Sequence, residues 1–324
     1  MRGKSERELV ALLERTFGGK RAQRSVLVGI GDDAAVLQVA GERLIWTVDT
    51  AVENVHFRTE WLSFEDVGWK SFHAAVSDIA AMGGTPVAAL SNLVSPESMP
   101  VAAVRALIKG QAHAARALRC PVVGGNLSRG SELSVTTTVL GRADEPLLRS
   151  GARSGDELWL AGDVGLAKAG LLWLSRKSKP SKIDARARRA IGRCVEAWRR
   201  PRALIRWGER LRRRAHAAID ISDGLSVDAA HLAEASRARV VIEEAKLRGV
   251  LSRDLVTASA VLGVDALELA LAGGEDYALL ATGPGRARPR GARRIGYVEK
   301  GRGVFLEAGG AMRRLRGGGF DHFG

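Results

Sequence analysis

The sequence predicts a mixed α+β fold built from two domains. Segments with helical spacing and strand-like apolar runs are interspersed, but they do not follow the strict alternation of a doubly wound sheet. The length of 324 residues exceeds that of most single domains. Arg, Ser and Gly residues cluster from Leu148 to Gly155, which is typical of a connection between domains. We therefore expect domains at residues 1–148 and 149–324.

The N-terminal half begins with a predicted helix. Ser5 to Glu8 form a capping-box pattern, and apolar residues follow at helical spacing as far as Phe17. Ser63 can cap a second helix, which runs to about Met82 and is stopped by Thr85-Pro86. The other expected elements are strands at 26–30, 34–39, 44–48 (ending at Asp49), 87–94 and 133–141, a loop at 54–57, a helix at 100–118, and a short buried strand at 121–123 that leads into residues 124–130.

The C-terminal half is expected to begin with a strand at 156–161, a glycine turn at Gly162–Gly165 and a helix through Leu174. Such a turn can bind phosphate at the helix N-terminus, although it is also common for purely structural reasons. Two Arg-rich helices follow, separated by Pro201. The other expected elements are strands at 217–221, 240–243, 277–281, 295–298 and 304–307, a helix at 224–236, and a helix that ends at Gly273.

The composition is that of a globular protein with a sizeable core, since 46% of residues are hydrophobic and 27% are charged. No segment approaches the ~18 consecutive apolar residues of a membrane span. The polar N-terminus lacks the apolar core of a secretion signal. Cys120 and Cys194 have neither metal-site spacing nor the pattern of a disulfide framework. We therefore expect a reduced, cytoplasmic protein with no membrane partner.

The chain is strongly basic, with a formal net charge of +14 and a pI of about 10.6. Such a balance can indicate nucleic-acid binding. The excess is mostly Arg, and the dense patches at 186–193, 199–214 and 286–294 fit solvated helix and loop surfaces. The sequence contains neither zinc-finger spacing nor an aromatic–basic RNA-binding signature. We therefore keep nucleic-acid binding only as a minor alternative.

Gly29 to Asp33 combine a flexible glycine turn with two adjacent carboxylates, whose repulsion favours a bound cation. Alone, this stretch is ordinary turn chemistry. Similar acids recur at expected strand ends, at glycine turns and in one helix, where apolar elements converge. The set comprises Asp32, Asp33, Asp49, Asp78, Asp220, Asp223, Glu275 and Asp276. Any one could be a cap, a turn former or a surface charge, but together they predict a site for several Mg²⁺ ions and a phosphate ligand.

Ordered motifs run through nearly the whole chain. They are Gly29–Asp33, Asp49-Thr50, Asn54–Phe57, Ser77–Gly83, Gly124-Gly125, Asp220–Leu225, Gly273–Tyr277 and Asp321–Phe323. This order resembles that of the thiamine-monophosphate kinases, within a superfamily that includes aminoimidazole ribonucleotide synthetase and selenophosphate synthetase. The His56 loop, the segment around Glu275 and the terminal Asp321–Phe323 favour the kinases. The reactive N-terminal Cys of selenophosphate synthetase is missing from this sequence.

The resemblance implies a homodimer in which the N-terminal mixed sheets of two subunits pair into a barrel, while a C-terminal α/β, sandwich-like domain covers the ATP cleft. It implies transfer of the ATP γ-phosphoryl group to thiamine monophosphate, giving thiamine diphosphate. By motif match, Mg²⁺ would be held by Asp33, Thr47, Asp49, Asp78, Asn126, Asp220 and Asp223. ATP would contact Gly125, Asn126, Arg149 and Ser222. The thiamine substrate would contact His56, Glu275 and Phe320.

No general base is expected in such a site, because a phosphate monoester has a second pKa near about 6 and is mostly a dianionic nucleophile at pH 7. Metal ions and Arg149 would instead align the two phosphates and neutralise their charge. Glu275 could pair with the cationic thiazolium or with the aminopyrimidine. Phe320 could stack on a ring or be a hydrophobic plug, and His56 could instead be a loop hydrogen-bonder.

Three positions depart from the family pattern. Asn126 stands where the family has a metal-ligating Asp, Val48 replaces a usual Thr, and Phe320 replaces a common Tyr. We therefore expect an active enzyme with a higher Mg²⁺ requirement. Alternative hypotheses are another ATP-dependent enzyme of the superfamily and a nucleotide-binding homologue with weakened catalysis. In the opening turn, Asp33 is the expected ligand, and Asp32 is expected either to shape the loop or to support the metal ligands without contacting the metal.

Overall fold

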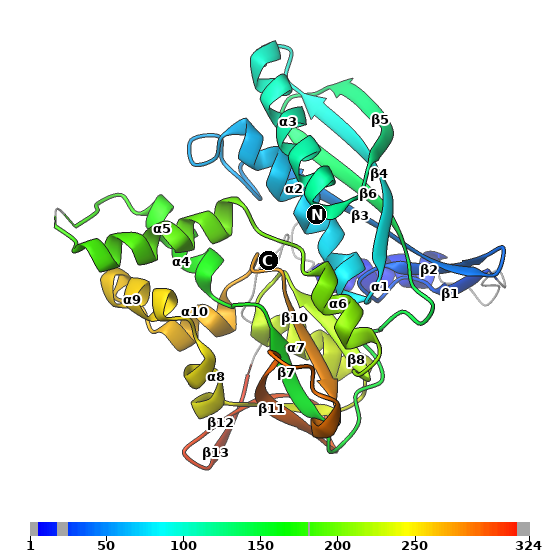
Figure 1. Cartoon of the computed structure of the whole chain (residues 1–324), viewed down its shortest axis with the longest axis vertical. Coiled ribbons are helices and arrows are strands. Elements are labelled where there is room, and N and C mark those ends of the chain that lie inside the picture. The colour runs from blue at the N-terminus through cyan, green and yellow to red at the C-terminus, as the bar shows by residue number, and fades with distance from the viewer. Residues whose placement is uncertain (1–5, 18–24, 181, 316–324) are drawn as a thin grey trace.

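The computed structural model describes residues 6–17, 25–180 and 182–315, which fold into two β-sheets with helices packed around them (Figure 1). The strands of the first sheet are β1 (Val26–Val28), β2 (Ala35–Val39), β3 (Glu42–Val52), β4 (Thr85–Ser95), β5 (Val122–Arg129) and β6 (Ser134–Arg142). They lie in the order β1-β2-β3-β6-β4-β5. The sheet is mixed, as predicted, since β4 and β5 are parallel and the other neighbours are antiparallel. Its two ends do not meet within the described chain, so this sheet alone is not a closed barrel.

Helices α1 (Glu6–Phe17), α2 (Phe64–Ala81) and α3 (Val101–Leu118) accompany the first sheet, and all three were predicted. Helix α2 begins where Ser63 caps it, with the Ser63 hydroxyl accepting from the Asp66 backbone N–H at 3.1 Å. It packs against the sheet on one side and against α3 on another (Figure 1). The two helices approach so closely at Gly68 that a Cβ there would lie 2.1 Å from the Leu107 carbonyl oxygen.

The second sheet occupies the C-terminal half. Its strands are β7 (Glu157–Ala161), β8 (Ala217–Ile221), β9 (Arg239–Glu243), β10 (Ala278–Gly283), β11 (Arg293–Glu299), β12 (Gly303–Ala308) and β13 (Ala311–Arg314). The order is β13-β12-β9-β11-β7-β10-β8, with β12 and β9 parallel. The helices are α4 (Leu166–Ser175), α5 (Ala185–Arg199), α6 (Ile205–Arg212), α7 (Leu225–Ala235), α8 (Glu244–Val250), α9 (Arg253–Leu262) and α10 (Ala266–Ala272), with a 3₁₀ turn at Gly285–Ala287.

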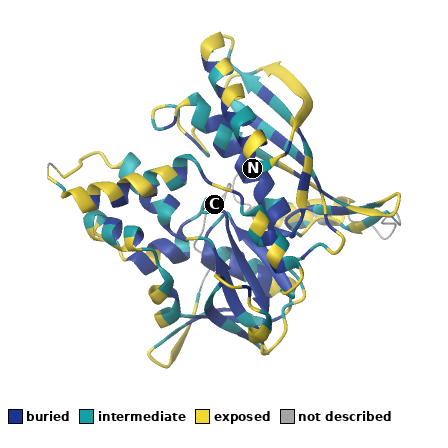
Figure 2. Cartoon of the chain, viewed as in Figure 1, coloured by how far each residue is buried: buried dark blue, intermediate teal, exposed yellow. Residues whose placement is uncertain are grey.

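Helix α2 belongs to the cores of both halves. Its C-terminal residues Ala80 and Ala81 pack with Trp159 and Ala218 of the second sheet. Nearly every residue of α2 from Val67 onward is therefore buried, as Figure 2 shows. A helix that is buried on most sides is held rigidly by its neighbours. The side chains of α2 therefore have well-defined positions relative to both sheets.

Several predicted boundaries were wrong. Asp49 does not end a strand, because β3 continues to Val52 by pairing with β6. The strand predicted at 121–123 continues to Arg129, because β5 pairs with β4 along that stretch. The predicted buried strand at 121–123 is instead part of an exposed edge, with every residue of β5 exposed (Figure 2). Helices α8 and α9 and strand β13 were not predicted.

Among the described residues, no single helix combines the length and the apolar composition needed to cross a membrane. The bent pair α9 and α10 passes that test together, on length and composition alone.

Candidate active site

A cavity of about 490 Å³ lies between the two halves of the molecule. It is lined by β3, the 54–61 segment, α2, α4, α5 and the turns that follow β8 and α10. Its lining combines acidic side chains with aromatic rings. The acids are Asp49, Asp78, Asp220, Asp223 and Glu275, and the aromatic residues are His56, Phe57, Trp61, Trp198 and Tyr277.

Three carboxylates meet beside this cavity. Asp33 follows the Gly31 turn, Asp78 lies in the last turn of α2, and Asp220 lies near the end of β8. One oxygen of each lies within 4.8 Å of the others, which is close enough for a single metal ion to bind all three. Two of the elements that carry them come from the first half of the chain and one from the second, so the fold itself assembles the trio.

The trio is electrostatically unfavourable without a cation. The pKa of Asp33 is raised to about 7, chiefly by burial and also by the charges of Asp220 and Asp32, against the opposing effect of Arg149. Burial also raises the pKa of Asp78 well above its usual range, with Asp220 and Asp33 adding to the effect. Burial is likewise the largest cause of the raised pKa of Asp220. Like charges in a desolvated site have this effect on one another.

Hydroxyl and guanidinium donors satisfy part of the trio. Thr47 Oγ1 donates to Asp78 Oδ2 at 2.5 Å, and Ser77 Oγ donates to Asp220 Oδ2 at 2.6 Å. The Arg149 guanidinium donates two hydrogen bonds to Asp33 Oδ1, at 2.7 and 3.0 Å.

One acceptor of the trio remains unsatisfied, because Asp33 Oδ2 is buried and has no hydrogen-bond partner among the described residues. A set of carboxylate oxygens with an unsatisfied acceptor fits a hard divalent cation such as Mg²⁺.

Asp32 fixes the loop that presents Asp33. One of its oxygens, Oδ1, accepts the backbone N–H of Asp33 at 3.0 Å, and both oxygens lie 3.2 Å from the backbone nitrogen of Arg149. These contacts agree with the loop-shaping role expected of Asp32. They also fasten the opening turn to the start of the second half of the chain.

The other predicted acids take different positions. Asp49 lies opposite Thr137 in the β3–β6 ladder and lines the cavity. Ser222 and Asp223, in the turn after β8, also line the cavity. The Asp228 carboxylate accepts the backbone N–H groups of Asp223 and Gly224, at 3.2 and 3.0 Å. This buried residue, not selected from the sequence, therefore sets the shape of the turn that carries Asp223.

The structure does not bring Asn126 to the trio. The ladders place Asn126 opposite Asn92, Asn92 opposite Thr136, and Thr136 opposite Thr50. Residues opposite one another share a sheet face, so Asn126 lies on the face of Thr50, whereas its neighbour Asp49 faces the other way. Three strand spacings of roughly 4.8 Å separate β5 from β3, or about 14 Å.

Two further ATP and substrate predictions stay open. Gly125 lies on the same exposed strand, and a Cβ there would lie 1.7 Å from the Ser91 carbonyl oxygen, so only glycine fits this strand pairing. Beside it, Asn126 Nδ2 donates to Ser128 Oγ at 2.9 Å. Phe320 lies outside the described residues.

An aromatic wall forms another part of the cavity. The Trp61 and Trp198 rings meet edge to face with centroids 6.1 Å apart. His56 Nδ1 accepts the backbone N–H of Val52 at 3.0 Å, which leaves Nε2 as the protonated nitrogen of the neutral ring. Flat aromatic surfaces beside an acidic cluster suit a ligand that has a ring at one end and phosphate at the other.

Glu275 lines the cavity beside that wall, and both its oxygens have protein partners. Oε1 lies 2.7 Å from Lys70 Nζ, and Oε2 accepts the Trp198 indole N–H at 2.6 Å. Neither Lys70 nor Trp198 was selected from the sequence. A lysine among the buried residues of α2 was the available signal, because such a lysine is rarely buried without an acidic partner.

Backbone N–H groups at and after the end of the glycine turn at Gly162–Gly165 are bonded by a side chain of the protein itself. The Asp276 carboxylate accepts the backbone N–H groups of Gly165 and Ala167, at 2.5 and 3.0 Å, and so caps α4. These hydrogen bonds already occupy two of the backbone N–H groups at the N-terminus of α4. The structure therefore supports the structural interpretation of this turn rather than phosphate binding.

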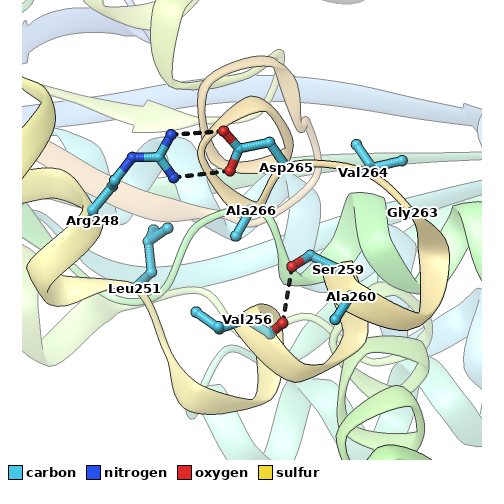
Figure 3. A pocket seen from close by; sticks show the side chains of 9 residues that line it. All are labelled: Arg248, Leu251, Val256, Ser259, Ala260, Gly263, Val264, Asp265 and Ala266. Carbon is cyan, nitrogen blue, oxygen red and sulfur yellow. Dashed lines mark hydrogen bonds and ion pairs between the residues drawn. The ribbon is translucent and has the colours of Figure 1, made fainter. Parts of the chain in front are cut away.

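A second hollow lies among α8, α9 and α10, and its charges satisfy one another. Figure 3 shows Arg248 and Asp265 joined by two hydrogen bonds, of 2.9 and 2.6 Å. The Ser259 hydroxyl, also drawn there, donates to the carbonyl of Val256 at 2.9 Å. The polar groups drawn in this hollow are thus paired with each other, in contrast to Asp33 beside the cavity.

Comparison with known proteins places these features in context. A model of the AIR synthase related protein, N-terminal domain, matches residues 31–143. The thiamine-monophosphate kinase of Aquifex aeolicus is 35% identical over 97% of both chains. The thiamine-monophosphate kinase of Mycobacterium tuberculosis strain H37Rv is 35% identical over 89% of this chain and 84% of its own. A solved structure of AaThiL complexed with AMPPCP and TMP has a TM-score of 0.87 and 33% identity, covering 98% of this chain and 97% of that one.

Proposed function

Because the chain belongs to the thiamine-monophosphate kinase family, we propose that it transfers the γ-phosphoryl group of ATP to thiamine monophosphate and releases thiamine diphosphate. The observation that carries the proposal is that one cavity joins a carboxylate trio to an aromatic wall. Phosphates and their counter-ions belong at the first, and a heteroaromatic substrate at the second. Relatives and structural neighbours favour this activity over the two alternative hypotheses.

The acceptor needs no general base, since its phosphate is mostly dianionic at pH 7. The protein must instead hold two anionic groups in line. Arg149 is suited to this task, because a guanidinium has five N–H donors and only two of them are used on Asp33. The proposed ATP contacts are Gly125, Asn126, Arg149 and Ser222, and the proposed substrate contacts are His56, Glu275 and Phe320.

The donor set fits Mg²⁺, given the oxygen ligands and the unsatisfied Asp33 Oδ2. When bound, Mg²⁺ would neutralise the phosphates and hold them in place. The proposed ligands are Asp33, Thr47, Asp49, Asp78, Asn126, Asp220 and Asp223. Thr47, Ser77 and Arg149 orient the carboxylates by the hydrogen bonds described above.

A homodimer formed through the first sheet is part of the proposal. The face of this sheet turned away from α2 exposes Trp46 (51%), Val48 (62%) and Leu90 (45%), and the edge strand exposes Leu127 (75%). A monomer rarely leaves such an apolar face in water, and an exposed edge strand invites pairing. Pairing into a barrel would cover both, and Asn126 of one protomer would then approach the cavity of its partner.

Leu127→Asp tests the dimer. We expect the wild type to sediment as a dimer and this variant as a monomer, because a charge on the edge strand would oppose pairing of that strand with a partner. Ile108→Asp on α3, at a residue that is also exposed (51%), is the matched control and should remain dimeric. A wild type that sediments as a monomer would contradict the proposal.

We also propose that residues 1–148 and 149–324 are the two domains and that the protein is cytoplasmic. The activity itself is tested with purified protein, ATP, Mg²⁺ and thiamine monophosphate, by following thiamine diphosphate and ADP. Formation of both products in equal amounts is the expected outcome. ATP binding without thiamine diphosphate would contradict the proposed activity and favour a homologue with weakened catalysis.

A further inference from the structure

Lys70 is a buried charge beside the cavity. It lies on α2 and is only 4% exposed. Its Nζ lies 2.7 Å from Glu275 Oε1, donates to the Trp198 carbonyl oxygen at 3.0 Å, and sits 4.5 Å from the centroid of the Trp198 ring. Lysine is rarely buried without such partners. The ammonium is thus held by one carboxylate, one carbonyl and one aromatic ring.

Besides Lys70, other groups hold Glu275 in place. Its second oxygen accepts the Trp198 indole N–H at 2.6 Å, and its backbone N–H donates to the Ser222 carbonyl at 2.7 Å. Its φ of +66° lies in the left-handed region, which is uncommon for a residue other than glycine. The preceding Gly274 makes this turn possible, since a Cβ there would lie 2.5 Å from the Ser222 carbonyl oxygen.

The pair of Lys70 and Glu275 has no net charge. A carboxylate whose charge is offset at 2.7 Å exerts little attraction on a further cation. Each of its oxygens still has a second lone pair, and the side chain is 24% exposed toward the cavity. Glu275 therefore retains hydrogen-bond acceptors for a ligand but little net charge.

We propose that Lys70 is a positioning residue that acts through Glu275, so that Glu275 recognises the acceptor substrate by accepting a hydrogen bond from a neutral ring amino group and not by pairing with a cationic ring. The inference rests on the proposed function and deepens it. In thiamine monophosphate the amino group is that of the pyrimidine, and the cation is the thiazolium.

The Lys70→Met variant distinguishes the two modes of recognition, because they predict opposite changes in KM for thiamine monophosphate. Without Lys70, Glu275 loses an anchor and becomes an uncompensated carboxylate that turns toward water. The proposal expects a rise of about 10-fold in KM for thiamine monophosphate, with KM for ATP changed by less than ~2-fold. A counter-ion role for Glu275 would instead lower KM, because the offsetting charge is gone. An unchanged or lowered KM overturns the proposal.

Lys109→Met is the matched control, since Lys109 pairs with Glu65 at 3.0 Å on the surface and is 60% exposed. It should leave both KM values within ~2-fold of wild type. A rise in KM as large as that of Lys70→Met would point to a general effect of lost charge and overturn the proposal.

A double-mutant cycle tests whether Lys70 acts through Glu275. We expect Lys70→Met to change KM for thiamine monophosphate by less than ~2-fold when it is combined with Glu275→Gln, because the amide has no charge for Lys70 to offset. If the full 10-fold effect persists in the Glu275→Gln background, Lys70 acts on general structure and the proposal fails. Trp198→Phe provides a second route if Lys70→Met does not fold, and should also raise KM by removing the indole donor.

Substrate analogues test the recognised group directly in the wild type. An analogue of thiamine monophosphate with hydrogen in place of the amino group should lose ~100-fold in kcat/KM, because it cannot donate the hydrogen bond to Glu275. Glu275→Ala should reduce that discrimination to a few-fold. A wild type that forms no thiamine diphosphate would overturn the proposed function together with this inference. An active wild type that accepts the analogue equally well overturns this inference alone.

Discussion

The cavity and the hollow among α8, α9 and α10 place the same type of side chain in opposite settings. In the hollow, hydrogen bonds from Arg248 lower the pKa of Asp265 to about 2, and both of its oxygens are bonded. At the cavity, burial raises the pKa of Asp33 to about 7, and one of its oxygens has no partner. The hydrogen-bonding capacity of the Asp265 carboxylate is satisfied within the protein. The Asp33 carboxylate has an oxygen for which the described residues supply no donor.

The difference shows how a functional acid can be told from a structural one. Arg248 also bonds Glu244, so this one guanidinium pairs with two acids near the hollow. Beside the cavity, the Arg149 guanidinium bonds Asp33, whereas Asp78 and Asp220 accept from the uncharged hydroxyls of Thr47 and Ser77. Proteins tolerate such an imbalance where function requires it. The comparison leads to four predictions, ordered from the largest expected effect to the smallest.

Asp78→Asn should lower kcat/KM by about 10³-fold, because it removes one metal ligand from the trio. The same change should raise the melting temperature measured without Mg²⁺, because it relieves repulsion among buried carboxylates. Steady-state kinetics and thermal melts in EDTA check both effects. Asp265→Asn is the matched control and should keep activity within ~2-fold while losing up to about 1 kcal/mol of stability. Equal losses of activity in the two variants would contradict the comparison.

Mg²⁺ should stabilise the wild type, because an ion that binds only the folded state shifts the unfolding equilibrium. At 100 times the dissociation constant the gain is about 2.7 kcal/mol, or several degrees in melting temperature. Thermal melts in a Mg²⁺ series measure this shift. Asp265→Asn should retain it and Asp78→Asn should lose most of it. A full shift in Asp78→Asn would show that Mg²⁺ binds elsewhere.

The pH dependence of stability should differ between the two regions. The folded pKa of Asp33 is raised, so its protonated form stabilises the metal-free protein at low pH, and this contribution is lost as pH rises through about 7. Asp33→Asn should therefore gain ~5 °C on the wild type between pH 5 and pH 7 in EDTA. Asp265→Asn should show no such trend, because the lowered pKa of Asp265 acts below pH 4. Parallel curves for Asp33→Asn and wild type would refute the expectation.

Asn126→Asp is expected to have the smallest effect. It replaces a neutral amide with a carboxylate at a proposed metal-ligand position and should lower the Mg²⁺ concentration needed for half-maximal activity by a few-fold. The effect is modest because Asn126 lies about three strand spacings, or ~14 Å, from Asp49 in one chain. Titrations of activity against Mg²⁺ measure it, and an unchanged requirement would remove Asn126 from the proposed ligands. Asn92→Asp, on the same sheet face, is the control.

Local signals accounted for much of the fold. Ser63 and the apolar spacing after it predicted α2 because an N-cap and a buried face are properties of neighbouring residues. The ends of β3 and β5 were missed because strand length depends on a partner strand. Nothing near Asp49 or Gly125 reveals that pairing continues past them.

The site was predicted in a similar, partial way. Asp33, Asp78 and Asp220 were selected from the sequence and do meet in space. Contacts between distant segments were not predicted, including Lys70 with Glu275 and the Asp276 cap of α4. Such contacts depend on the way whole elements pack, which local patterns do not specify.

Helix α2 also fixes the distance between the aromatic wall and the carboxylate trio. Lys70 and Asp78 are eight residues apart on one rigid helix, which corresponds to about 12 Å along its axis. Lys70, towards one end of α2, holds Glu275 beside the aromatic wall, and Asp78, towards the other end, belongs to the carboxylate trio. If the acceptor binds as proposed, its ring and its phosphate must together span this distance. A phosphate ester too short to span that distance would engage one end at a time, and a series of substrates of graded length should show KM rising once the span is lost.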